Sequence, residues 1–172
     1  MSSDTHRDTV CVEAGGLTLE IEIAAGAEIL DASLPQRIAA ALGAGNDIAG
    51  PAEGSVTLIV DDDERILGLN KLWRRLDKPT NVLSFSYPAS QPGPVRYIGD
   101  IAISYETAAR EAAAEHKPLS DHVVHLAVHG FLHLLGYDHE ADVDADEMER
   151  LERVILARVG VPDPYVAHET EG

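Results

Sequence analysis

The chain has 172 residues, 45% of them hydrophobic, which suits one domain with one core. Its formal net charge of -17 at pH 7 opposes indiscriminate binding to polyanions. Cys11 is the only cysteine, which excludes an internal disulfide, and no apolar run is long enough to span a membrane. Because no apolar signal segment begins the chain, we expect a cytoplasmic protein, and its length suits a single domain over residues 1–172 with tails at 1–8 and 163–172.

Taken in chain order, the apolar pattern predicts strands and helices that follow one another without a regular repeat. Alternation of apolar and polar residues marks half-buried strands, and apolar residues three or four apart mark helices. Gly43, Pro79 and Pro118 are expected to end helices. The predicted strands cover 9–13, 17–23, 55–60, 81–87 and 96–104. The predicted helices cover 34–42, the segment after the capping run 61–63, 105–116, the segment capped by Ser120, and 143–159.

This order of elements predicts the α+β class, in a single domain with a mixed sheet of about four strands and about five helices packed on it. The helix that begins near Ser120 is apolar around most of its circumference, so we expect it to lie at the centre of the fold. Residues 46–54 and 88–94 contain glycine and proline and are expected to form loops. Gly99, within a predicted strand, indicates a bulge or a close approach of another backbone.

The stretch that carries chemistry is 129–139. His129 and His133 are four residues apart, so on a helix they share one face. Gly136 can take the left-handed conformation that ends a helix, and the chain can then fold back to bring His139 to the same point. Three imidazoles with no fourth side chain describe a catalytic zinc site that keeps one position open. The alternative is a buried helix whose histidines form hydrogen bonds within the core.

Gly130 occupies the position at which zinc proteases of the His-Glu-x-x-His type carry their glutamate. The absence of this glutamate disfavours proteolysis, because cleavage of a peptide needs an acid/base group that protonates the amine leaving group. Cleavage of a phosphodiester depends mainly on charge stabilisation and positioning, which zinc and an arginine can supply. His122 and His125 lie on the same stripe as His129, and we expect them to form hydrogen bonds rather than to bind metal.

Charge is distributed unevenly along the chain. Five basic residues fall within 65–78, and an acidic segment covers 140–152. The basic cluster can admit a phosphate backbone at one place, whereas the acidic segment repels it; the alternative is that both are ordinary solvated helix faces. Composition alone does not separate Arg65, Arg74 and Arg75 as the arginine that binds phosphate.

Three segments, 69–85, 99–101 and 129–139, closely resemble the YbeY family of bacterial endoribonucleases and occur in the family's order. The resemblance implies that His129, His133 and His139 bind one Zn²⁺ per chain. It also implies that Arg74, which precedes the Pro-Thr-Asn-Val-Leu-Ser-Phe run, is the catalytic arginine.

The function implied by this resemblance is single-strand-specific cleavage of RNA, in 3′-end maturation of 16S rRNA and in ribosome quality control. The implied partners are single-stranded rRNA, the small ribosomal subunit including protein uS11, and the GTPase Era, with no membrane. Two alternatives remain open. One is a zinc metalloprotease-like hydrolase, and the other is a non-enzymatic ribosome assembly factor with a structural zinc.

Overall fold

A computed structural model of the chain describes residues 7–24, 32–50, 52–74, 81–87, 96–137 and 142–165, with backbone alone at 7–8, 72–74 and 142–145. Within these residues, five strands form one mixed sheet in the order β1-β2-β3-β5-β4. Strand β2 pairs antiparallel with β1 and parallel with β3, and β5 pairs parallel with β3 and antiparallel with β4. The strands are β1 (Arg7–Ala14), β2 (Leu17–Ala24), β3 (Gly54–Asp61), β4 (Val82–Ser86) and β5 (Tyr97–Ser104).

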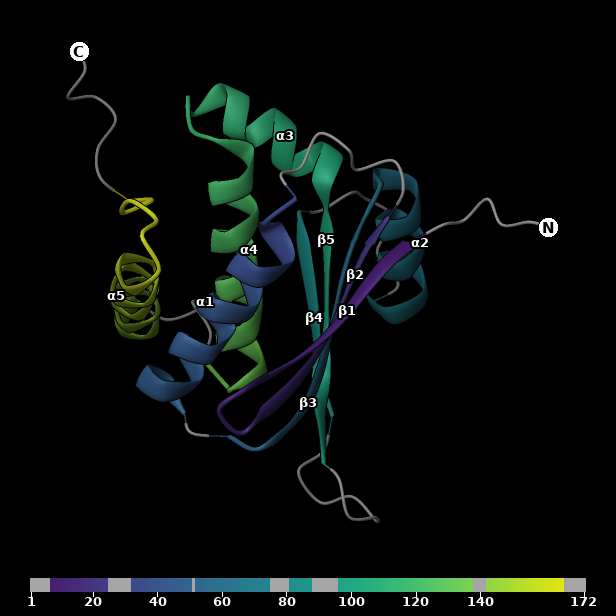
Figure 1. The fold of residues 1–172 in the computed structure, drawn as a ribbon. Coiled ribbons are helices and arrows are strands. Elements are labelled where there is room, and N and C mark those ends of the chain that lie inside the picture. Colours follow the sequence, from purple (N-terminus) through teal and green to yellow (C-terminus); the bar gives the residue numbers. More distant parts are fainter. Residues whose placement is uncertain are drawn as a thin grey trace.

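The described helices cover both faces of this sheet (Figure 1). They are α1 (Leu34–Ala49), α2 (Asp63–Arg74), α3 (Tyr105–Ala114), α4 (Leu119–Leu134) and α5 (Asp142–Arg158). Helix α2 lies on one face, whereas α1 and α4 lie on the other, and α5 packs on α1 and α4 away from the sheet. The predicted α+β class, with a mixed sheet and five helices, is confirmed. None of these helices is both long and apolar enough to cross a membrane.

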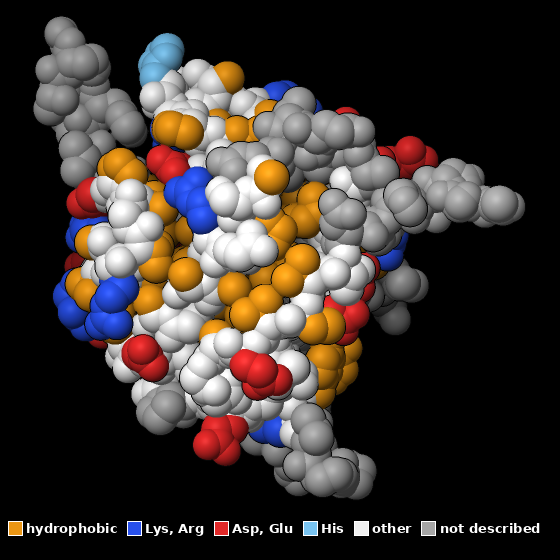
Figure 2. Space-filling view, viewed as in Figure 1, with side chains coloured by type: hydrophobic (Ala, Val, Ile, Leu, Met, Phe, Trp, Pro, Cys, Tyr) orange, Lys and Arg blue, Asp and Glu red, His pale blue; other side chains and the backbone are white. Residues whose placement is uncertain are grey.

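Helix α4 occupies the centre of the main core, as its apolar circumference predicts. Its Val124, Val128 and Phe131 side chains are fully buried, between the sheet on one side and α1 and α5 on the other. A smaller cluster joins Ile66 of α2 to Leu83 of β4 and Ala102 of β5. On the face seen in Figure 2, apolar side chains show across the middle and charged ones stand mainly around the rim. Burial of α4 on several sides holds its polar residues in defined positions.

Two glycines allow α4 to lie close to β5. A Cβ atom added to Gly130 would lie 2.9 Å from Cγ2 of Ile101, and one added to Gly99 would lie 2.6 Å from Cδ2 of Leu134. Both distances are shorter than side chains tolerate, so the helix and the strand touch at positions that lack a side chain. The pairing of β3 with β5 also shifts register beside Gly99. The close approach expected at Gly99 is therefore confirmed, and Gly130 is directed at the sheet.

The first helix runs further than expected. Gly43 does not end it, and α1 continues to Ala49, through part of the predicted loop at 46–54. The reason is tertiary packing, because a Cβ at Gly43 would lie 3.2 Å from Cβ of Ala14. The turn after the helix is held by Asn46, whose side chain accepts from the backbone N–H of Ala52 at 2.8 Å and donates to its carbonyl at 3.0 Å. Here glycine serves close helix packing and does not stop the helix.

At the ends of three elements, the structure departs from the predicted boundary twice and agrees with it once. Helix α4 begins at Leu119 with Pro118 in the capping position, so Ser120 is not its cap. Strand β1 begins at Arg7, inside the segment expected to be a tail. The expected capping run is confirmed, since Asp62 accepts from the backbone N–H of Arg65 at 2.9 Å at the start of α2. The predicted loop at 88–94 lies outside the described residues.

Candidate metal centre

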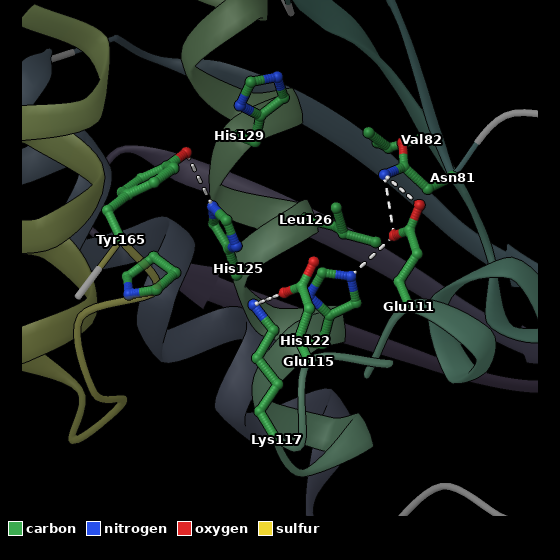
Figure 3. A pocket seen from close by; sticks show the side chains of 11 residues that line it. Asn81, Val82, Glu111, Glu115, Lys117, His122, His125, Leu126, His129 and Tyr165 are labelled. Atoms are coloured by element: carbon green, nitrogen blue, oxygen red, sulfur yellow. Dashed lines mark hydrogen bonds and ion pairs between the residues drawn. The ribbon is translucent and has the colours of Figure 1, made fainter. Parts of the chain in front are cut away.

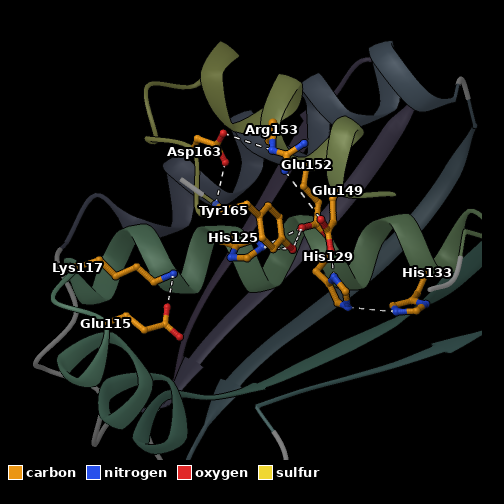
Figure 4. Close-up of polar contacts among 10 residues, drawn as sticks. All are labelled: Glu115, Lys117, His125, His129, His133, Glu149, Glu152, Arg153, Asp163 and Tyr165. Atoms are coloured by element: carbon orange, nitrogen blue, oxygen red, sulfur yellow. Dashed lines mark hydrogen bonds and ion pairs between the residues drawn. The ribbon is translucent and has the colours of Figure 1, made fainter. Parts of the chain in front are cut away.

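His129 and His133 lie one turn apart near the end of α4, and their rings meet edge to face. Their Nε2 atoms are 3.2 Å apart, and the ring planes meet at 79°. Two nitrogens bound to one tetrahedral zinc at about 2.0–2.1 Å lie about 3.3 Å from each other. The two imidazoles therefore already hold the separation of two neighbouring ligands of one zinc ion (Figure 4).

The chain turns sharply after His133, as the position of Gly136 predicts. Gly136 has a φ of 105°. The backbone N–H of Tyr137 donates to the carbonyl of Leu132 at 3.1 Å, which closes the last turn of the helix. His139 itself lies outside the described residues, so its role as third ligand stays a prediction. Within the described residues, no group of three or more His, Cys, Asp or Glu side chains is arranged to hold a metal ion.

Glu152 of α5 supports the first of these histidines from behind. It is fully buried, and its Oε2 lies 2.6 Å from Nδ1 of His129. Its Oε1 lies 2.9 Å from Nε2 of His125 and also accepts from the hydroxyl of Tyr165. Burial acts to raise the pKa of Glu152, but the hydrogen bonds from His125 and His129 outweigh it and lower the pKa to about 2. Glu152 is therefore an ionised carboxylate at neutral pH.

This carboxylate determines the tautomer of His129. A carboxylate only accepts, so Nδ1 of His129 carries the proton and donates. In the neutral ring, Nε2 then presents its lone pair toward the side where His133 lies. Carboxylate–histidine pairs of this kind orient the imidazole ligands of zinc sites. The donor chemistry of the described residues therefore fits a divalent metal such as zinc.

Sequence reasoning did not identify Glu152 or Tyr165 as part of the site. Glu152 counted as one of the residues of an acidic segment, and Tyr165 fell in the predicted tail. One signal was present for Glu152, because it shares a helical stripe with residues that are all buried: Met148, Leu151, Ile155 and Leu156. A carboxylate on the apolar face of a helix requires a buried partner, and the histidines of α4 supply two. For Tyr165 no sequence signal existed.

His122 and His125 form hydrogen bonds, as expected. His125 binds Glu152, and Nε2 of His122 lies 2.8 Å from Oε1 of Glu111 on α3. Burial lowers the pKa of His122, although the bond to Glu111 acts in the opposite direction. His122 is 5% exposed, so it is a core residue and not a surface group.

The candidate arginines divide into three cases. Arg74 is the last residue of α2, and its side chain is not among those that the structure describes. Its assignment as the catalytic arginine therefore stays a prediction. The guanidinium of Arg65 forms an ion pair with Asp61 at 3.5 Å. Arg75 lies outside the described residues.

A groove of about 590 Å³ extends from His129 along α4 (Figure 3). The three histidines of the stripe form its floor together with Leu126, and the walls come from three other segments. These are the start of β4, the end of α3 with the turn that follows, and the C-terminal segment, with lining residues Asn81, Val82, Glu111, Glu115, Lys117, Pro164 and Tyr165. A space of this size accommodates a small organic ligand next to the candidate metal centre.

Comparison with known proteins identifies the same family that the three segments resemble. The family model described as "Endoribonuclease YbeY" matches residues 25–160. An "Endoribonuclease YbeY" from Nitrobacter hamburgensis is 51% identical over 150 residues, which cover 84% of this chain and 76% of that protein. One from Chelativorans is 46% identical, over 86% of this chain and 93% of its own length. The solution structure of TM1509 from Thermotoga maritima has a TM-score of 0.53 and 25% identity, over 81% of this chain and 88% of that one.

Proposed function

This chain belongs to the endoribonuclease YbeY family and has an endoribonuclease role, and from that premise we propose that its cleavage depends on one zinc ion held by His129, His133 and His139. The observation that carries the proposal is the 3.2 Å separation of the two Nε2 atoms, backed by the buried carboxylate of Glu152. Burying a carboxylate together with several imidazoles costs desolvation free energy. A functional site therefore explains this arrangement better than stability does.

The residues of the proposed site have distinct roles in cleavage. Glu152 fixes the ring of His129, so that Nε2 is available as a ligand without a change of rotamer. When bound, zinc would supply a Lewis acid that neutralises charge developing on the phosphoryl oxygens. Arg74 binds the same phosphate through its planar guanidinium, which matches two phosphate oxygens at once. Cleavage then depends on positioning and charge rather than on a glutamate base.

We propose single-stranded rRNA as the substrate, with 3′-end maturation of 16S rRNA and ribosome quality control as the cellular roles in the cytoplasm. Small-subunit protein uS11 and the GTPase Era are the proposed protein partners. The net charge of -17 supports a substrate restricted to particular rRNA segments, because an acidic protein gains little from general attraction to RNA. Binding then relies on local contacts at the groove and on partners that deliver the substrate.

The packing of Gly130 argues against the protease alternative. A glutamate base must point at the metal, but position 130 points at Ile101 of β5, where a Cβ alone would lie at 2.9 Å. The side of α4 that bears Gly130 is thus used for helix–sheet contact. No glutamate fits there without moving the helix from the sheet.

The test is cleavage of a 16S rRNA precursor, extended at its 3′ end, by freshly purified protein. We expect cleavage in single-stranded segments, loss with a chelator, and recovery on addition of Zn²⁺. Arg74→Ala should abolish cleavage while zinc content, measured by elemental analysis, stays at one per chain. Arg158→Ala, which removes an exposed arginine at the end of α5, serves as the control. Cleavage that persists in the chelated protein would overturn the zinc dependence.

A further inference from the structure

We propose that the groove beside His129 binds one nucleobase of the RNA strand next to the cleaved phosphate, and that Glu111 favours bases with an exocyclic amino group over uracil. This inference rests on the proposed function, because the phosphate must lie at the metal centre for its neighbouring base to enter the groove. His129 belongs to both, since its ring lines the groove and its Nε2 faces His133. A nucleotide bound at the centre therefore has the groove within reach.

The charge of the groove favours a base over a phosphate. Its described lining carries two carboxylates, Glu111 and Glu115, against one ammonium, Lys117. That ammonium is already engaged, because Nζ of Lys117 lies 2.7 Å from Oε1 of Glu115. A phosphate placed here would face a net negative lining with no unengaged cation among the described residues. A neutral base meets no such repulsion.

Flat rings line the groove in the way that single-stranded bases require. Tyr165 is 37% exposed, and its ring meets the ring of His125 edge to face, with centroids 5.6 Å apart. Its hydroxyl donates to Glu152, which holds the ring in place. Single-stranded bases are commonly bound by stacking on tyrosine and histidine. Tyr165 is thus an ordered platform at the side of the groove.

Glu111 supplies an acceptor at the opposite wall (Figure 3). Its Oε1 accepts from Nδ2 of Asn81 at 3.1 Å and lies 2.8 Å from Nε2 of His122. Its Oε2 takes, within the described residues, only the longer contact of 3.3 Å from the same Asn81. The side chain remains 35% exposed, so a ligand in the groove can reach it. A carboxylate oxygen has room for a further donor, and the amino groups of cytosine, adenine and guanine are such donors.

The experiment measures binding first, so that it does not depend on cleavage. Tetranucleotides of 2′-O-methylcytidine and of 2′-O-methyluridine, verified to be intact after the measurement, are titrated against the zinc-loaded protein by fluorescence anisotropy. We expect the cytosine oligomer to bind about tenfold more tightly, as one hydrogen bond to a charged group provides. Glu111→Gln should remove most of this difference, because an amide offers a donor to the carbonyl of uracil as well as an acceptor. Glu64→Gln, which removes an equal charge from an exposed site on α2, should keep it.

Stacking is tested separately from selection. Tyr165→Ala should weaken both oligomers alike, by about fivefold or more, because stacking tolerates every base. Tyr165→Phe keeps the ring but loses the hydroxyl contact to Glu152, and it should retain most of the binding that Tyr165→Ala loses. Equal affinity for the two oligomers, or an unchanged preference in Glu111→Gln, would overturn the inference even if the enzyme cleaves rRNA normally. Selective binding without any cleavage would instead count against the proposed function and leave the base site standing.

Discussion

Oε2 of Glu152 on α5 and Nδ1 of His129 on α4 lie 2.6 Å apart, although 23 residues separate them in the chain. This contact joins the candidate metal centre to a helix that contributes no proposed ligand. It also extends to Tyr165, so the C-terminal segment, Glu152 and His129 form one connected set (Figure 4). The position of α5 therefore affects the metal centre directly.

Glu152→Gln should weaken zinc binding by about 10- to 100-fold, the usual effect of losing the carboxylate behind a histidine ligand. An amide accepts less strongly and has only one oxygen for the two histidines that Glu152 now serves. The measurement is a competition titration with a chromophoric chelator. Glu149→Gln, one turn earlier and 42% exposed at its side chain, is the matched control. An unchanged zinc affinity in Glu152→Gln would show that this carboxylate serves only the core.

His133→Ala should leave a folded protein that no longer retains zinc and no longer cleaves RNA. Truncation removes one of the two Nε2 atoms that now lie 3.2 Å apart. Elemental analysis after gel filtration gives the metal content, and circular dichroism checks the fold. His116→Asn, at an exposed turn after α3, should keep both zinc and activity. Retention of one zinc per chain by His133→Ala would remove this residue from the ligand set.

Gly130→Ala should destabilise the protein by about 1–3 kcal/mol, the range found for an added group in a packed core. The new Cβ would lie 2.9 Å from Cγ2 of Ile101, so α4 or β5 must shift. Chemical denaturation measures the free energy of unfolding. Gly68→Ala on α2 is the control, because no atom lies within 4 Å of its added Cβ. There, alanine should stabilise the helix by about 1 kcal/mol or less, and a similar gain at position 130 would contradict the packing described.

Stability should fall as the pH drops below about 6.5, in part because of His122. Burial holds the pKa of His122 in the folded protein below the ordinary histidine value of about 6.5, so on acidification the unfolded chain takes up a proton before the folded chain does. The resulting loss begins near pH 6.5, can reach about 1.4 kcal/mol per pH unit, and levels off below the folded pKa. His122→Gln keeps a donor for Glu111 but cannot titrate. Its free energy of unfolding should therefore depend less on pH from 7.5 to 5.5 than that of the parent or of His116→Gln.

Local sequence patterns were sufficient to predict the structural features that depend only on residues close together in the chain. Spacing of four residues placed His129 and His133 on one face of α4, and glycine at 136 marked the turn after it. The same logic failed at Gly43, because a glycine that permits close packing looks identical in sequence to one that ends a helix. Only the neighbouring Ala14 distinguishes the two cases.

The sequence by itself determined the α+β class, the central helix and the placement of two imidazoles on one face of that helix, because helical and strand periodicity act over a few residues. Tertiary structure alone decided that Glu152 lies behind His129, that position 130 faces the sheet, and that a groove with Glu111 and Tyr165 opens beside the metal centre. These features join residues that are distant in the chain, and their contacts exist only after α3, α4 and α5 have packed together.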